Sequence, residues 1–194
     1  MLKTLYLIAA GAVMLASCQQ KTETTTSGTG TISHDSLIKR GSYLVNMMAC
    51  TDCHTPKKMG PNGPEPDPAL LLSGHPSGLP LPKIDTAATK DWAMTNMHNT
   101  AWVGPWGVSF TANLTPDETG IGSWTEAQFF KAIREGKSKG LDGNRALLPP
   151  MPWPSYAQAS DDDLKAIFAY LKSIKPVKNV VPQPIPPTQL ASLK

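Results

Sequence analysis

The feature that most constrains this chain is the pentapeptide Cys50-Thr51-Asp52-Cys53-His54. The 194 residues contain three cysteines, and the third, Cys18, lies far upstream in a different kind of sequence. No disulfide framework can be built from Cys50 and Cys53 except a bond between the two. The fold must therefore be organised around two thiols three positions apart and the imidazole that directly follows them.

This spacing is the pattern that attaches haem c covalently. Two thiols three positions apart near a helix end can each add to one vinyl group of a single haem. The imidazole of His54 then lies under the iron and becomes its proximal ligand, so that porphyrin and protein keep one orientation. We therefore predict one covalent haem c held by Cys50, Cys53 and His54.

The cysteine pair fits a redox dithiol or a zinc site less well than it fits haem. A thioredoxin-like redox pair begins a helix after a strand, whereas the residues before Cys50 have helical periodicity. A structural zinc site needs four ligands, and the chain offers neither a second cysteine pair nor a His-x3-5-His motif. A chance match would leave an exported protein with an exposed, reactive dithiol.

The N-terminus has the features of a bacterial export signal. Lys3 precedes an apolar run over residues 5–17 that is too short to span a bilayer permanently. Leu15-Ala16-Ser17-Cys18 resembles the lipobox of bacterial lipoproteins, in which the signal is cut before a cysteine that receives lipid; the alternative is an ordinary signal peptide. We predict a signal peptide at 1–17, a lipidated flexible tether at 18–33, one domain at 34–176 and a Pro-rich tail at 177–194.

Lipid on Cys18 would hold the exported protein on a membrane, facing the periplasm, because each buried CH2 adds about 0.8 kcal/mol. An Asp directly after the lipidated cysteine resembles an inner-membrane retention signal. This chain has Gln19 at that position, and the absence of Asp favours the outer membrane. The chain carries 18 Lys and Arg residues against 15 Asp and Glu residues, and one of the basic residues, Lys3, leaves with the signal. This near balance does not indicate a nucleic-acid partner.

Apolar periodicity and capping residues predict three helices, over 35–48, 126–135 and 161–173. Asp35 is the expected cap of the first, Thr125 and Gln128 form a capping box for the second, and Ser160 caps the third. Gly41 is costly in the middle of a helix, so we expect another helix to approach it closely.

The rest of the domain is expected to hold little regular structure. Residues 108–114 alternate between apolar and polar, which predicts a strand and, with the segment 95–102 and a turn at 104–107, a small hairpin. Residues 56–90 are rich in Gly and Pro and should form an irregular loop over the haem edge. Such a long loop needs a large buried group to organise it, and a haem would serve.

A haem-packed electron carrier usually supplies a second axial ligand, and the candidates are Met59, Met94, Met97, Met151, His75 and His98. Met59 is close to His54 in sequence, and methionines are more often core fillers than ligands. Met151 is favoured because prolines at 149, 150 and 152 stiffen its loop. A His/Met pair would raise the reduction potential relative to a bis-His pair.

Residues 35–176 resemble the class I cytochromes c. A helix with Gly41, the Cys50 to His54 motif, a loop with Met151 and a last helix ending in Ala169-Tyr170-Leu171 follow that family's order. The motifs at 112–117, 119–122 and 150–152 are similar to monohaem modules in cytochrome subunits of periplasmic quinoprotein alcohol dehydrogenases. Those subunits usually carry three modules, whereas this chain carries one, with a long insert at 57–106.

The resemblance implies a mainly α, cytochrome c-like fold around one haem, with long irregular loops and a small β-hairpin. It also implies that propionates are held by side chains among Trp102, Trp106, Trp124, Arg145 and Asn113. We expect a periplasmic electron carrier with redox protein partners and without an enzymatic activity of its own. The alternatives are a cytochrome subunit of a dehydrogenase or oxidase complex and a haem-based small-ligand sensor.

Overall fold

The computed structural model describes residues 33–193. The predictions for the signal peptide, for Cys18 and for the tether up to residue 32 lie outside the described residues. The α-helices between residues 33 and 193 are α1 (His34–Met47), α2 (Cys50–His54), α3 (Glu126–Glu135), α4 (Trp153–Tyr156) and α5 (Asp161–Ser173). Among these helices, none has the length and apolar character that crossing a membrane requires.

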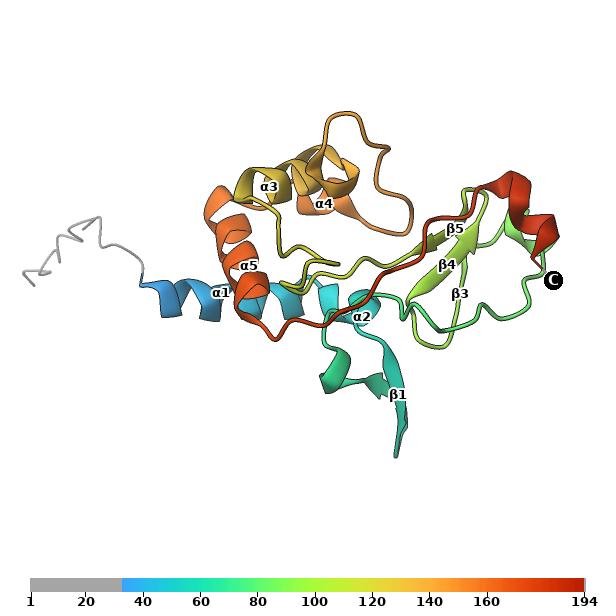
Figure 1. Ribbon diagram of the computed structural model, residues 1–194, viewed down its shortest axis with the longest axis horizontal. Helices are drawn as coiled ribbons and strands as arrows, with labels where there is room; N and C mark the ends of the chain where they lie inside the picture. The colour runs from blue at the N-terminus through green and yellow to red at the C-terminus, as the bar shows by residue number, and fades with distance from the viewer. Residues whose placement is uncertain (1–32, 194) are drawn as a thin grey trace, which may run out of the picture. The chain divides into compact units, whose positions relative to one another are not determined.

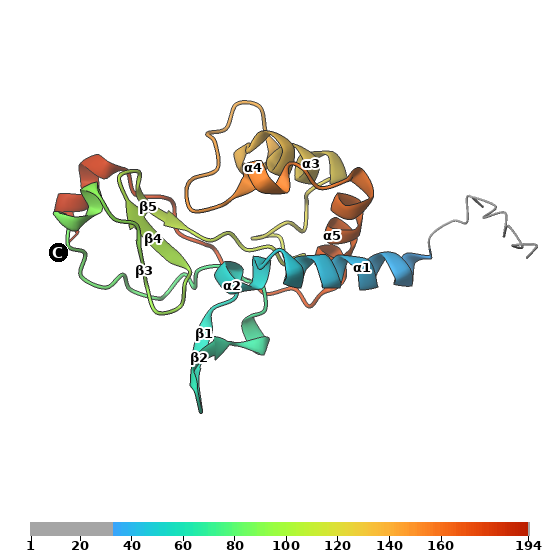
Figure 2. The ribbon, with the colours of Figure 1, turned by 180° about the vertical axis from the view of Figure 1, so that it is seen from behind.

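The strands form two small antiparallel sheets, β1 (Lys57–Gly60) with β2 (Gly63–Pro66), and β3 (Met94–Thr95), β4 (Ala101–Gly104) and β5 (Gly107–Phe110) in that order. Short 3-10 turns lie at Pro68–Leu70, Ala88–Lys90, Ser138–Gly140 and Pro187–Ser192. In both ribbon views the helices gather at the N-terminal end of the domain, the three-stranded sheet lies at the other end, and the β1–β2 hairpin projects from its side (Figures 1 and 2).

Helices α1 and α5 cross each other (Figure 1), and Gly41 lies at their contact. Gly41 is buried, and a Cβ atom there would lie 2.0 Å from the carbonyl oxygen of Ala166 and 2.7 Å from the Cβ of Tyr170. The close approach predicted from this glycine is confirmed. Beside the crossing, Arg40 binds Asp163 at 2.9 Å between Nη2 and Oδ1.

The predicted caps of α3 and α5 are confirmed, and that of α1 is wrong. The Gln128 side chain accepts from the Thr125 backbone N–H, and the Gln128 backbone N–H donates to the Thr125 hydroxyl. These two bonds complete the capping box of α3. Ser160 accepts from the backbone N–H of Asp163 at the start of α5. At α1, Ser33 is the cap, because its hydroxyl accepts from the Ser36 backbone N–H at 3.2 Å, and Asp35 lies in the first turn of a helix that begins at His34.

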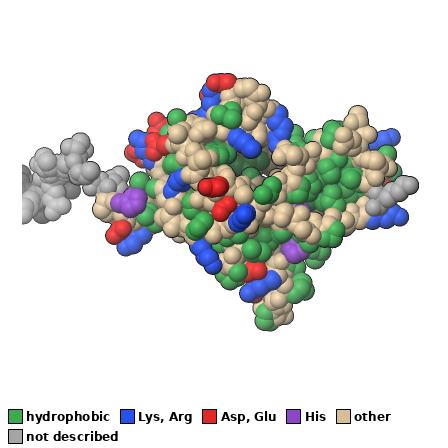
Figure 3. Space-filling view, in the orientation of Figure 1, with side chains coloured by type: hydrophobic (Ala, Val, Ile, Leu, Met, Phe, Trp, Pro, Cys, Tyr) green, Lys and Arg blue, Asp and Glu red, His purple; other side chains and the backbone are tan. Residues whose placement is uncertain are grey.

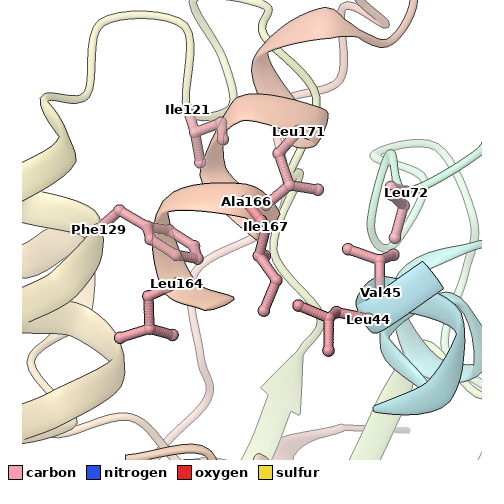
Figure 4. Packing of buried hydrophobic residues seen from close by; sticks show 9 residues of the cluster. All are labelled: Leu44, Val45, Leu72, Ile121, Phe129, Leu164, Ala166, Ile167 and Leu171. Carbon is pink, nitrogen blue, oxygen red and sulfur yellow. The ribbon is translucent and has the colours of Figure 1, made fainter. Parts of the chain in front are cut away.

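The main core lies where α1, α3 and α5 meet the loops that connect them. Figure 4 shows this core as one cluster of buried side chains, formed by Leu44, Val45, Leu72, Ile121, Phe129, Leu164, Ala166, Ile167 and Leu171. Leu72 and Ile121 come from loops, yet each is at most 1% exposed. The loops on both sides of the haem motif are therefore fixed by the same hydrophobic burial that joins the helices.

A second, smaller cluster covers the three-stranded sheet. The predicted small hairpin is confirmed as β4–β5, with Gly104 opposite Gly107 at the turn. Its predicted bounds are wrong, because 95–102 is divided between β3 and β4 and the strand expected over 108–114 ends at Phe110. Val103 and Val108 pack against Leu190 from the C-terminal tail. The tail itself is held by an antiparallel bridge between Val108 and Ile185. Much of the predicted Pro-rich tail is thus packed against the domain.

Hairpin β1–β2 was not expected, because its composition indicated an irregular loop. The two strands pair from Lys57 with Pro66 to Gly60 with Gly63. Gly63 adopts a positive φ of 118° directly after Asn62, and Asn-Gly is a strong hairpin-turn signal. The prolines in β2 concealed it, since proline is tolerated in a strand at a sheet edge.

Replacing Gly41 tests the crossing of α1 and α5. Gly41→Ala should lower the free energy of unfolding by about 1–3 kcal/mol, because the added methyl group meets backbone atoms of α5 that cannot move aside. Urea denaturation measures the change. Gly143→Ala is the matched control, since a Cβ at Gly143 has no atom within 4 Å. Equal stability of the two variants would contradict the packing described.

Candidate functional site

The two thiols of the motif lie on the single turn of α2. Ala49 takes a left-handed conformation, with φ 55° and ψ 28°, and so separates α1 from α2. Cys50 and Cys53 are free and half-buried, and His54 closes the turn in a buried position. The structure therefore brings the three predicted attachment residues together on one short helix.

The imidazole of His54 is oriented by one backbone hydrogen bond. Its Nδ1 lies 2.7 Å from the carbonyl oxygen of Ala112. Because a carbonyl oxygen only accepts, this contact places the ring proton on Nδ1 and leaves a lone pair on Nε2. Burial lowers the pKa of His54, which favours the neutral ring. A neutral imidazole with a free Nε2 is the form that binds a metal ion.

Two loops hold the main chain around His54. Gly74 donates its backbone N–H to the His54 carbonyl at 2.8 Å, and Leu72 donates to the Thr55 hydroxyl at 3.0 Å. A Cβ at Gly74 would lie 2.5 Å from the carbonyl carbon of Ala112, so only glycine allows the two loops to meet there. Ala112, which accepts from the His54 ring, and Gly74, which donates to the His54 carbonyl, are thus packed against each other.

Burial disfavours the thiolate form of both cysteines. Burial raises the pKa of Cys50 to about 11, and burial also raises the pKa of Cys53. Asn99 donates its side-chain amide to the Asp52 carbonyl at 3.0 Å and approaches Cys53 Sγ at 3.6 Å. Catalytic disulfide exchange uses a cysteine of lowered pKa. The arrangement is therefore unlike a thioredoxin-type redox pair.

The loop that carries Met151 is anchored on two sides, to strand β5 and to the end of α1. Ser109 of β5 donates to the Pro149 carbonyl at 2.6 Å. Tyr156 of α4 donates its hydroxyl to the Met48 carbonyl at 2.5 Å, two residues before Cys50. Met151 is half-buried between these two anchors. Its role as an axial ligand stays a prediction, and the anchors support it.

The other candidates for a second axial ligand differ in exposure and in the partners of their polar atoms. The buried ring of His75 contacts Thr100 Oγ1 at 3.0 Å and packs on Phe110 with centroids 4.8 Å apart. Met59 and Met97 are 76% and 75% exposed. Met94 packs against the second cluster, and His98 lies half-buried in the turn beside Asn99. Among the described residues, His75 Nε2 and His98 Nδ1 are buried without a hydrogen-bond partner, so these two histidines stay alternatives to Met151, which we favour for its anchored loop.

Four of the five suggested propionate ligands already have other partners. Trp102 donates to the Asn99 carbonyl, Trp106 to Ser109 and Arg145 to the Ala146 carbonyl. Asn113 donates to the carbonyl of Val177 in the C-terminal tail. The indole nitrogen of Trp124 forms no hydrogen bond among residues 33–193. Trp124 and Arg145, whose guanidinium has five N–H donors, therefore keep donors for a new acceptor.

Sequence reasoning missed Ala112, Asn99 and Tyr156. Ala112 acts through its carbonyl, so its side chain carries no signal. Asn99 has a positive φ of 58°, which is typical of Asn, but its contact with Asp52 spans 47 residues of chain. Tyr156 lies 108 residues from Met48. Contacts over such separations depend on the fold and leave no local pattern.

Taken together, the donor set fits a covalently attached haem. Two free thiols lie on one helical turn, and a neutral imidazole beside them presents an unoccupied Nε2. The surface is hollowed between the part that carries α3 and α4 and the part that carries the three-stranded sheet (Figure 3). Among the described residues, no group of three or more His, Cys, Asp or Glu side chains could hold a metal ion without such a cofactor.

Comparison with known proteins gives one consistent result. The model of the Cytochrome c family matches residues 38–175. The chain is 35% identical over 147 residues to the gluconate 2-dehydrogenase cytochrome c subunit of Pantoea cypripedii, covering 75% of this chain and 25% of that protein. It is 33% identical over 145 residues to the alcohol dehydrogenase (quinone) cytochrome c subunit of Gluconobacter oxydans (strain 621H), covering 74% and 23%.

A third relative is the fructose dehydrogenase cytochrome subunit of Gluconobacter japonicus, 32% identical over 167 residues that cover 85% of this chain and 26% of that protein. The chain therefore spans about a quarter of the length of these curated relatives.

Removing one hydroxyl tests the anchor between α4 and the motif. Tyr156→Phe should lower the free energy of unfolding by about 1 kcal/mol, because the Met48 carbonyl loses its hydrogen-bond donor. Tyr43→Phe is the control, since Tyr43 is 54% exposed. Equal urea midpoints for the two variants would show that the Tyr156 bond contributes nothing.

Proposed function

Because the chain belongs to the cytochrome c family, matched over residues 38–175, we propose that the mature protein is a lipid-anchored, periplasm-facing monohaem electron carrier. The family assignment makes it an electron-transfer cytochrome with covalently attached haem c and redox protein partners, and not an enzyme in its own right. The anchor, the compartment and the independence of the carrier are the parts that we propose.

The observation that carries this proposal is the hydrogen bond from His54 Nδ1 to the Ala112 carbonyl beside two free thiols. Cys50 and Cys53 would hold the porphyrin through thioether bonds, and His54 Nε2 would bind its iron. When bound, the haem supplies one-electron redox chemistry. The protein fixes the ring orientation of His54, because its Nδ1–H partner is a backbone atom that cannot rotate away.

Met151 would supply the second axial ligand from its Pro-rich loop. The Ser109 to Pro149 bond and the Tyr156 to Met48 bond hold that loop without using the thioether. A weak sulfur ligand can stay in place when its backbone is fixed on both sides. With both axial positions filled by protein, electron transfer needs little rearrangement and no substrate enters at the iron.

A second candidate is a cytochrome subunit of a dehydrogenase complex. It is favoured by the three relatives, each of which is named as a cytochrome subunit of a dehydrogenase. We propose the free carrier first because the sequence holds one Cys-x2-Cys-His motif and therefore one site for covalent haem.

Solubilisation of native membranes separates these two candidates. A free carrier should elute from a mild detergent extract as a single haem protein, with the 20.8 kDa of the full sequence less its signal peptide, plus haem, lipid and detergent. Size-exclusion chromatography with detection of both haem and protein measures this. Stoichiometric co-elution with a dehydrogenase would contradict the free carrier and support the subunit.

Substitution of Met151 tests the second axial ligand. Met151→Ala should convert the low-spin spectrum of the protein to a high-spin one and let the reduced form bind carbon monoxide rapidly, because one axial position becomes open. Visible spectroscopy measures both effects. Met97→Ala is the control, since Met97 is 75% exposed. An unchanged low-spin spectrum in Met151→Ala would remove this residue as a ligand.

Substitution of Cys18 tests the anchor. Cys18→Ser should move the protein from the membrane fraction to the soluble periplasmic fraction, because the acyl chains are no longer attached. Haem content per polypeptide should stay the same, since Cys50 and Cys53 are untouched. Fractionation followed by haem staining measures both. Retention of Cys18→Ser on the membrane would rule out lipidation as the anchor.

A further inference from the structure

The chain continues beyond the residues that the family model matches, and its next residues bind the two loops that pack beside the haem motif. The family match ends at residue 175. Val177 then accepts from the Asn113 side chain at 2.8 Å and donates its N–H to Thr115 Oγ1 at 3.1 Å. Asn179 donates its N–H to Thr119 Oγ1 at 2.9 Å. Residues 177–179 are thus pinned to the loop that directly follows Ala112.

The Asn179 side chain extends this attachment to a second loop. It is 9% exposed, and its Nδ2 donates to the carbonyls of Ser73 at 2.7 Å and His75 at 2.9 Å. Its Oδ1 accepts from the Ser77 N–H at 3.0 Å. Both amide protons and the amide oxygen are therefore used, which makes this buried side chain a cross-link between the tail and residues 73–77.

Residues 73–77 are the loop that supports His54. Gly74, between the two carbonyls that Asn179 binds, donates to the His54 carbonyl at 2.8 Å. The next residue, His75, donates its backbone N–H to the Thr111 carbonyl at 3.0 Å, one peptide before Ala112. Asn179 therefore binds the same short segment that binds the His54 main chain, through Gly74, and the peptide before Ala112, through His75.

We propose that Asn179 is a positioning residue for the proximal ligand, acting through residues 73–75 to fix the Ala112 carbonyl against His54 Nδ1. This inference rests on the proposed ligation of haem iron by His54. The partner of the second ring nitrogen sets the basicity of a metal-bound imidazole. A firmly held carbonyl makes His54 a stronger electron donor, which favours oxidised iron and keeps the reduction potential low.

The amide is suited to this position because it faces two carbonyl oxygens and one N–H. Aspartate would place a charged oxygen against the two carbonyls, and alanine would leave all three backbone groups without their partner. Serine keeps a single donor on a shorter side chain. These differences give a graded series of variants at one site.

The test compares the haem-loaded, full-length protein with Asn179→Ala, Asn179→Ser and Leu190→Ala. In Asn179→Ala, exchange of the His54 Nδ1–H and of the Gly74 and His75 amides should accelerate by about tenfold, because opening of this loop loses buried hydrogen bonds. Nuclear magnetic resonance of the reduced protein measures exchange, and redox titration should show an upward shift in potential. Asn179→Ser should shift both quantities in the same direction by less, and it serves as the test if the alanine variant does not load haem.

Leu190→Ala is the matched control for a loosened tail. Leu190 is 6% exposed and anchors the far end of the tail in the second cluster, which includes none of residues 73–77. It should lower stability while leaving the His54 exchange and the potential unchanged. Equal shifts in Leu190→Ala and Asn179→Ala, or no shift in either Asn179 variant, would overturn the proposal. A wild-type protein without haem would instead refute the proposed function.

Discussion

The structure depends above all on the bond between the His54 ring and the Ala112 carbonyl. This contact joins the short helix α2 to a loop 58 residues further along the chain. It selects the tautomer of the ring, so that the nitrogen facing away from the backbone keeps its lone pair. The rest of the domain can be understood as the framework that holds these two partners 2.7 Å apart.

That framework has a helical part and a loop part. Gly41 lets α1 and α5 approach until backbone meets backbone. This contact holds α1, the helix that leads through the left-handed Ala49 into α2. Leu72 is fully buried in the same cluster, so the loop that leads to Gly74 is held by hydrophobic burial rather than by regular structure. The long segment between Leu72 and Ile121 is held because both of these residues pack into the main core and the three-stranded sheet forms between them in the sequence.

The C-terminal residues add a third support. They lie beyond the part of the chain that the family shares, yet Asn113 and Asn179 connect them to both loops around His54. Further along, Leu190 closes the second cluster over the sheet. A tail rich in proline suits this role, because an extended chain can reach from one cluster to the other while leaving few donors unpaired.

Sequence patterns predicted the parts of this molecule that are local. The capping box at Thr125 and Gln128 and the Ser160 cap marked the starts of α3 and α5, and Gly41 indicated a close helix crossing. The pairing of β1 with β2 was missed because the prolines outweighed the Asn62-Gly63 turn signal. Ala112 and Asn179 could not be predicted, since one acts through its carbonyl and the other binds residues more than 100 positions away.

Covalent attachment of haem to Cys50 and Cys53 is best tested by the intact mass of the mature protein purified from its native host, together with its visible spectrum. We expect one haem per polypeptide that survives denaturation and acid extraction, a Soret band, and loss of both when the two cysteines are replaced by alanine. A mass equal to that of polypeptide plus lipid, without a Soret band, would show that no haem is attached.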